Sequence, residues 1–116
     1  MAKKINSREK GKTGEREFAK LCREQGYEKA RRGQQYNGLD GQDVVGLDGI
    51  HIEVKRVERL NIDEAMKQSI RDSKEGEIPI VAHRKNRESW KITMLAEDWF
   101  KLYKAWRDSV DGCERW

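Results

Sequence analysis

Residues 42–57 decide the fold of this chain, and they read QDVVGLDGIHIEVKRV. Apolar and polar side chains alternate before and after the turn-forming tripeptide Leu47-Asp48-Gly49, which is typical of two strands joined in a β-hairpin. The pattern therefore predicts strands over 42–47 and 50–57.

The length of the hairpin loop fixes which side chains share a face of the sheet. A two-residue loop would place Val44 opposite Glu53 and mix an apolar and a charged residue on one face. A three-residue loop, closed by Gly49 at a positive φ, places Val44 opposite Ile52 instead. We expect this second register because it separates the two kinds of side chain. One face then carries Val44, Ile50, Ile52 and Val54, and the other carries Asp43, Glu53 and Lys55.

The polar face of the hairpin favours a chemical function. Asp43 and Glu53 on adjacent strands would stand about 5 Å apart at their Cβ atoms, close enough to share a hard cation. Two carboxylates this close repel each other, so we expect a metal ion, and Mg²⁺ prefers such oxygen ligands. Lys55 would lie beside the metal, where its ammonium group can bind a phosphate oxygen or hold the attacking water. These groups suit phosphodiester hydrolysis, whereas the alternative is a solvated face on which Lys55 only pairs with Glu53.

A helix before the hairpin supplies a third carboxylate. Asn6 and Glu9 have the spacing of a capping box, and Gly26 is a stop signal. The buried stripe of this helix is predicted to contain Gly14, Phe18, Leu21, Cys22 and Gln25. Glu15 lies at the edge of that stripe and can face the sheet, whereas Glu17 points roughly opposite and is expected on the surface.

Between this helix and the hairpin, residues 27–32 are predicted as a short edge strand and 33–41 as a flexible polar loop. After the hairpin, Asn61 and Glu64 form a second capping box, which opens a helix ending near Gly76. The apolar stripe of that helix is Ile62, Ala65, Met66 and Ile70.

The remaining segments complete a mixed α/β pattern. Strands are predicted over 78–83 and 90–94, and an amphipathic helix follows from Leu95. Its apolar residues are Leu95, Trp99, Leu102, Tyr103 and Trp106. The predicted fold class is α/β, with a central mixed β-sheet flanked by helices in the order αβββαββα.

The length of 116 residues leaves room for one domain. We expect a single unit over 1–116, with a loose basic arm at 1–5 and a C-terminal helix and tail at 95–116. No apolar run approaches the ~18 residues of a membrane span, and the first thirty residues lack the apolar centre of a signal peptide. The two cysteines are far apart, which excludes a zinc ribbon and argues against a disulfide scaffold. These features predict a cytoplasmic protein with no membrane partner.

Positive charge is concentrated near the N-terminus. The chain has a net charge of +4, but residues 1–35 hold 11 Lys/Arg against 5 Asp/Glu, and residues 36–116 hold 14 against 16. A basic N-terminal third suggests a polyanionic partner, with nucleic acid the first candidate. The alternative is a charged, solvated surface without a partner.

Three segments together resemble a known nuclease superfamily. They are KGKTGEREF at 10–18, QDVV at 42–45 and IEVK at 52–55. In this order and spacing they look like the PD-(D/E)xK superfamily and, within it, the archaeal- and phage-type Holliday junction resolvases. The resemblance covers roughly residues 8–94. Gln42 stands where the superfamily pattern has proline, and the helix from Leu95 extends past the family core.

The resemblance implies a restriction-endonuclease-like core and Mg²⁺-dependent cleavage of four-way DNA junctions by paired nicks, with Mn²⁺ as a substitute metal. The catalytic residues it implies are Glu15, Asp43, Glu53 and Lys55. Glu15, Asp43, Glu53 and the carbonyl of Val54 would hold the metal.

Further residues are candidates for contact with DNA. Cations expected to meet phosphate groups are Lys10, Lys12, Arg16, Arg31 and Arg32. Gln68, on the helix after the Glu53 strand, is a possible accessory residue, although a solvated position is favoured for it. His51 and His83 are expected to have structural roles.

A homodimer is expected because a four-way junction needs two opposed cuts and one small domain carries one site. The face formed by Trp99, Tyr103 and Trp106 is a candidate contact between the subunits. Two alternatives remain: a nickase or flap endonuclease of phage replication or packaging, and a DNA-binding module without catalysis. The source would be a bacterium, an archaeon or a phage-infected cell.

Overall fold

The computed structural model describes residues 7–33 and 42–114, with side chains over 10–33 and 42–112. Its helices are α1 (Ser7–Glu24), α2 (Ile62–Asp72) and α3 (Ala96–Glu114). Its strands are β1 (Arg31–Arg32), β2 (Val44–Val45), β3 (Ile50–Arg56), β4 (Ile78–Arg84) and β5 (Lys91–Met94). This order confirms the predicted mixed α/β class and the sequence αβββαββα. The basic arm at 1–5, Asn6 of the first capping box and residues 34–41 of the polar loop lie outside the described residues.

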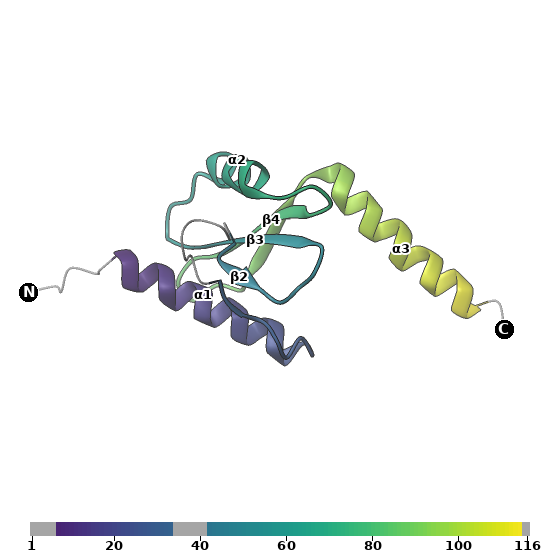
Figure 1. Ribbon diagram of the computed structural model, residues 1–116, viewed down its shortest axis with the longest axis horizontal. Coiled ribbons are helices and arrows are strands. Elements are labelled where there is room, and N and C mark those ends of the chain that lie inside the picture. The colour runs from purple at the N-terminus through teal and green to yellow at the C-terminus, as the bar shows by residue number, and fades with distance from the viewer. Residues whose placement is uncertain (1–6, 34–41, 115–116) are drawn as a thin grey trace, which may run out of the picture.

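The five strands form one sheet in the order β1-β2-β3-β4-β5. β3 and β4 are parallel, and the other neighbours are antiparallel. The parallel pair requires a crossover connection, which α2 provides. Figure 1 shows α1 and α2 on opposite sides of the sheet. The mixed sheet therefore has one helix on each face.

The predicted hairpin register is confirmed. Val44 pairs with Ile52, Gly49 has φ +90°, and the backbone N–H of Ile50 donates to the carbonyl of Leu47 over 3.2 Å. β2 is shorter than predicted because Gly46, at φ +111°, turns the chain out of extended conformation directly after Val45.

The main core lies between α1 and the apolar face of the sheet. Phe18, Ala19 and Cys22 of α1 pack against a group of buried sheet residues, namely Val44, Ile52, Val54, Ile80 and Ala82. Burial also raises the pKa of the Cys22 thiol. A smaller core under α2 contains Ala65, Met66 and Val81. Each face of the sheet is thus closed by its own helix.

The predicted stripe of α2 is wrong at one position. Ile70 is 42% exposed, and the buried residue of that turn is Ser69, whose hydroxyl donates to the carbonyl of Ile80 over 2.9 Å. At about 100° per residue, Ser69 follows Ala65 on the same line of the helix, whereas Ile70 lies further round. The helix also ends at Asp72, earlier than predicted, because Ser73 is extended. The Asn61 cap is confirmed by its bond to the backbone N–H of Glu64 at 3.2 Å.

Gly14 allows α1 to lie close to β3. A Cβ atom at this position would stand 2.8 Å from the Cβ of Arg56 and 3.7 Å from Cγ1 of Val54. No described atom lies within 4 Å of the corresponding position at Gly11. The two glycines of α1 therefore differ in function, because only Gly14 sets the distance between helix and sheet.

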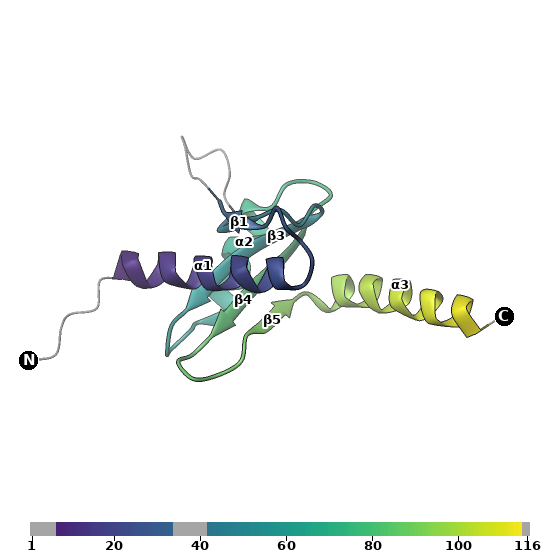
Figure 2. The ribbon, with the colours of Figure 1, turned by 90° about the horizontal axis from the view of Figure 1, so that it is seen from below.

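Helix α3 leaves the body of the domain. Both ribbon views show it continuing outward from the end of β5, away from α1 and α2 (Figures 1 and 2). In the described part of the chain, no helix is long and apolar enough to cross a membrane.

The two glycines of α1 give a first prediction. Gly14→Ala should lower the free energy of unfolding by about 1–3 kcal/mol, because the added methyl group forces α1 away from β3. Gly11→Ala is the matched control and should raise it by up to about 1 kcal/mol through helix propensity. Urea unfolding followed by circular dichroism measures both, and equal effects of the two substitutions would contradict the close approach at Gly14.

Candidate active site

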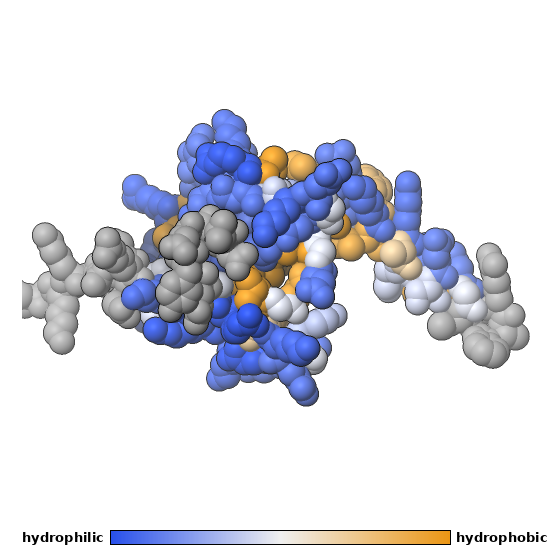
Figure 3. All heavy atoms as spheres, viewed as in Figure 1, coloured by the Kyte–Doolittle hydropathy of each residue, from blue (hydrophilic) through white to orange (hydrophobic). Residues whose placement is uncertain are grey.

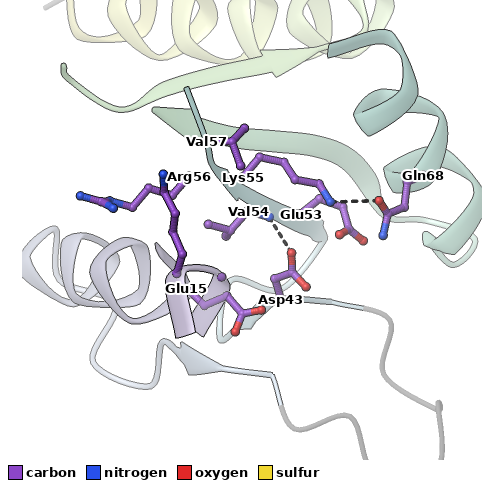
Figure 4. Close-up of a pocket in the computed structure, with 10 residues that line it drawn as sticks. Glu15, Asp43, Glu53, Val54, Lys55, Arg56, Val57 and Gln68 are labelled. Carbon is purple, nitrogen blue, oxygen red and sulfur yellow. Dashed lines mark hydrogen bonds between the residues drawn. The ribbon is translucent and has the colours of Figure 1, made fainter. Parts of the chain in front are cut away.

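Side chains from α1, the hairpin and α2 surround one cavity of about 330 Å³. Glu15, Asp43, Glu53 and Lys55 all line it, and Figure 4 shows them reaching it from different elements. The full lining is Lys10, Gly11, Glu15, Asp43, Glu53, Val54, Lys55, Arg56, Val57 and Gln68. The structure thus brings together the four residues that the sequence singled out for chemistry.

Asp43 lies immediately before β2 and is anchored to β3. The backbone N–H of Val54 donates to its Oδ2 over 2.8 Å. Burial raises the pKa of Asp43 to about 7, the nearby charges of Glu53 and Glu15 add to the rise, and the Val54 hydrogen bond opposes it. Neighbouring negative charge therefore disfavours ionised Asp43, and a cation at this point would relieve the repulsion.

The Val54 hydrogen bond also orients a backbone carbonyl. In an extended strand the N–H and C=O of one residue point to the same side. Because the Val54 N–H points toward Asp43, its carbonyl also faces the β2 side of β3 rather than β4. Val54 itself lines the cavity.

Glu53 is held by a buried histidine. The side chains of both Glu53 and His51 are 1% exposed, and Nε2 of His51 lies 3.0 Å from Oε1 of Glu53. On the other side of the ring, Nδ1 lies 3.8 Å from Oε1 of Glu77 and forms no hydrogen bond among the described residues. Glu77 accepts in turn from the Gln42 side chain over 2.8 Å. This chain of contacts fixes the orientation of Glu53.

The sequence placed His51 on the Glu53 face but did not predict this contact, and Glu77 was missed. Glu77 comes immediately before β4, and the parallel pairing of His51 with Pro79 brings that end of β4 beside the histidine. A sequence signal existed only for His51, as an ionisable residue inside an apolar strand two positions from Glu53.

Glu15 reaches the cavity from α1 and is paired with Arg32. The Nε atom of Arg32 donates to Oε2 of Glu15 over 2.8 Å, and the glutamate side chain is 18% exposed. Arg32, predicted to bind phosphate, therefore lies beside the acidic cluster and holds its third carboxylate. Arg31 is exposed, and its guanidinium donates to the carbonyl of Lys29 over 3.2 Å.

Lys55 and Gln68 form the wall opposite α1. The ammonium group of Lys55 donates to Oε1 of Gln68 over 3.2 Å (Figure 4). Gln68 is half-buried and lines the cavity, so the solvated position favoured for it is wrong. Gln68 immediately precedes the buried Ser69 and lies one turn before the half-buried Asp72, so it is on the side of α2 that faces the sheet. The local pattern alone did not distinguish this side from the outer side.

Glu17 is a second correction. Its Oε2 lies 3.2 Å from Nε of Arg56 and 3.5 Å from Nη1 of Arg84, and its side chain is 31% exposed rather than free on the surface. Arg56 and Arg84 come from paired strands, whose adjacent ends place two guanidinium groups under α1. Their attraction turns the glutamate toward the sheet.

The other predicted DNA-contacting residues lie on α1. Lys10 lines the cavity, Lys12 is half-buried and Arg16 is exposed. His83 bonds Oγ1 of Thr93 over 2.9 Å, away from the cavity lining, in agreement with a structural role.

The donor atoms at the cavity suit a hard divalent cation. Three carboxylates and a backbone carbonyl are all oxygen ligands, as Mg²⁺ prefers. Across the described residues, however, no three His, Cys, Asp or Glu side chains already stand close enough together to enclose a metal ion. The reason lies in the pairings above, since Arg32 holds Glu15 and His51 holds Glu53.

Comparison of the chain with protein-family models, with curated proteins and with solved structures finds no match. Function is therefore inferred from the residues of the cavity themselves.

The raised pKa of Asp43 predicts how stability depends on pH. Between its ordinary value of 3.8 and about 7, the unfolded chain releases the Asp43 proton while the folded chain keeps it, so rising pH lowers the free energy of unfolding. Asp43→Asn should remove this pH dependence. Without divalent ions, the free energy of unfolding of the variant relative to that of the wild type should be about 1–3 kcal/mol higher at pH 8 than at pH 4.

The measurement is urea unfolding in EDTA across that pH range. Asp48→Asn, at an exposed position of the hairpin turn, is the matched control and should follow the wild-type curve. A difference between wild type and Asp43→Asn that does not change with pH would show that the pKa of Asp43 is the same in the folded and the unfolded chain.

The contact between His51 and Glu53 gives a further prediction. His51→Ala should lower the free energy of unfolding by about 3–5 kcal/mol, because it leaves a buried carboxylate without its partner. His83→Ala removes a half-buried histidine from one hydroxyl contact and should cost about 1 kcal/mol. Thermal and urea unfolding compare the two variants, and a His51→Ala loss no larger than the control would show that Glu53 does not need the imidazole.

Proposed function

We propose that this chain is a metal-dependent endodeoxyribonuclease of the PD-(D/E)xK kind, with a restriction-endonuclease-like core. The single observation that supports it most is the meeting of Asp43, Glu53 and Lys55 with Glu15 around one cavity. Carboxylates concentrated beside a lysine have no use in a pure DNA-binding surface, because they repel phosphate. They suit a site that binds a divalent metal and a phosphodiester together.

Each residue has a role in this proposal. Asp43, Glu53, Glu15 and the Val54 carbonyl would hold Mg²⁺. The ion would supply a water of lowered pKa and would neutralise charge on the phosphate. Lys55 would bind a phosphate oxygen or orient the attacking water, and Gln68 would keep its ammonium group in place through the 3.2 Å bond.

DNA would approach along the basic side of α1. Lys10 lines the cavity, and the exposed Arg16 on α1 and Arg31 on β1 add positive charge. Such charge attracts the phosphate backbone without reading its sequence. Arg32 holds Glu15 through its Nε atom, so its first role is to orient that carboxylate.

The substrate we propose is a four-way DNA junction, cut by paired nicks in two opposed strands. The described residues form one cavity with this set of carboxylates and lysine, and two-fold symmetry between two chains would supply the second cut. Flap and nicked-duplex cleavage by the same cavity would require only one copy.

The test is incubation of the protein with labelled four-way, flap and linear DNA, with and without Mg²⁺. We expect Mg²⁺-dependent paired nicking of the junction. Lys55→Ala should lower the cleavage rate at least about 100-fold, and Asp43→Asn should abolish cleavage while junction binding is retained. Lys67→Ala, at an exposed position of α2, is the matched control and should cleave at the wild-type rate.

Other outcomes would overturn parts of the proposal. Preferred cleavage of flaps would replace the junction as substrate. Metal-independent binding that weakens steeply with salt, with no nicking in Mg²⁺ or Mn²⁺, would leave a DNA-binding module. Full activity of either variant would remove that residue from the mechanism.

A further inference from the structure

Helix α3 presents an apolar stripe to solvent. Four large side chains along one side of the helix are 42–57% exposed, namely Trp99, Leu102, Tyr103 and Trp106. Trp99 stacks on Tyr103 with ring centroids 5.4 Å apart, and Tyr103 contacts Trp106 at 5.8 Å. The rings are therefore ordered against one another along the helix rather than buried in the domain.

A groove of matching character lies on the α1 side of the same chain. It has a volume of about 360 Å³ and walls from α1, the hairpin and β5, with almost no polar surface. Its half-exposed apolar residues include Ile92 on β5 at 49% and Tyr27 after α1 at 53%. Leu102 of the chain's own α3 also lines the groove. From the end of β5, α3 runs away from the body of the domain (Figures 1 and 2). Figure 3 shows apolar surface where α3 leaves the domain.

The apolar area available fits an interface between two copies. Half-exposed aromatic side chains leave about 100 Å² each in solvent, so the stripe and the two exposed groove residues offer about 500 Å² per copy. A stable interface of standard size buries about 800 Å² per partner, a little over half of it apolar. Exchange of helices would bury both surfaces at once.

Charge complementarity favours docking of α3 in the groove beside α1 over docking of α3 against the α3 of a second copy. α1, which forms one wall of the groove, carries six Lys/Arg and four Asp/Glu, whereas α3 carries three and five. A net positive helix therefore lies where a net negative helix would dock. Two α3 helices side by side would instead bring together chains of the same sign.

We propose that the occupant of the groove is α3 of a second copy of this chain, with each copy inserting its helix into the other. This arrangement is isologous, so it closes as a two-fold dimer rather than an open chain of copies. It rests on the apolar surfaces alone and holds whether or not the cavity is a nuclease site.

The test is the mass of the full-length protein by size-exclusion chromatography with light scattering, and the dissociation constant by sedimentation. The wild type is expected to be dimeric. Trp106→Glu in the stripe and Ile92→Glu in the groove should each raise the dissociation constant about 30-fold or more. Lys104→Glu, about half a turn away from the stripe, is the matched control and should remain dimeric. Circular dichroism checks that each variant is folded.

Mixing the two monomeric variants distinguishes exchange from other arrangements. The Ile92→Glu chain keeps an intact α3 and the Trp106→Glu chain keeps an intact groove, so the mixture should form heterodimers with one restored contact. A dimeric Ile92→Glu variant would overturn the proposal in favour of pairing between α3 helices. A monomeric wild type would overturn it in favour of α3 folding back on its own chain or binding another protein.

Discussion

The pairing of Val44 with Ile52 is the constraint on which the rest of the structure depends. A shift of one residue would exchange the two faces of the hairpin, moving Glu53 into the core under α1 and Ile52 into the cavity. Gly49 prevents that shift, because its positive φ closes a three-residue loop. One backbone conformation thereby separates the residues that stabilise the domain from those that gather at the cavity.

The buried carboxylates of the cavity lower the stability of the folded domain. Burial and neighbouring carboxylates raise the pKa of Asp43, and Glu53, at 1% exposure, is held by His51. Apolar side chains at these positions would avoid the free-energy cost of burying charged groups. The arrangement is understandable if a cation completes it, since opposite charge removes the repulsion and strengthens the hold on each carboxylate.

Helix α3 has a different relation to the domain. An isolated helix of its length is marginal in water, and most helices are stabilised by packing of their apolar side. The stripe around Trp99 and Trp106 is half in solvent, while the groove beside α1 remains open to apolar atoms. The exchange of α3 between two copies that we propose would bury both surfaces without any change in the fold.

The candidate site could be predicted in part from sequence. Alternation along the hairpin placed Asp43, Glu53 and Lys55 on one face, and the helix stripe placed Glu15 at its edge. The side chains that contact these carboxylates were not predicted. The pairing of Glu15 with Arg32 and the approach of Glu77 to His51 join segments far apart in the chain, for which periodicity carries no signal.

The sequence by itself determined the order of the elements, the hairpin register and the side of each amphipathic helix that is apolar. Those features follow from local periodicity, since side chains alternate every two residues in a strand and recur every 3.6 in a helix. Only the tertiary structure decided that β4 lies parallel to β3, that Glu17 turns toward Arg56, and that α3 leaves the domain. Periodicity reports whether a side chain needs burial, but not which distant segment, or which copy of the chain, provides it.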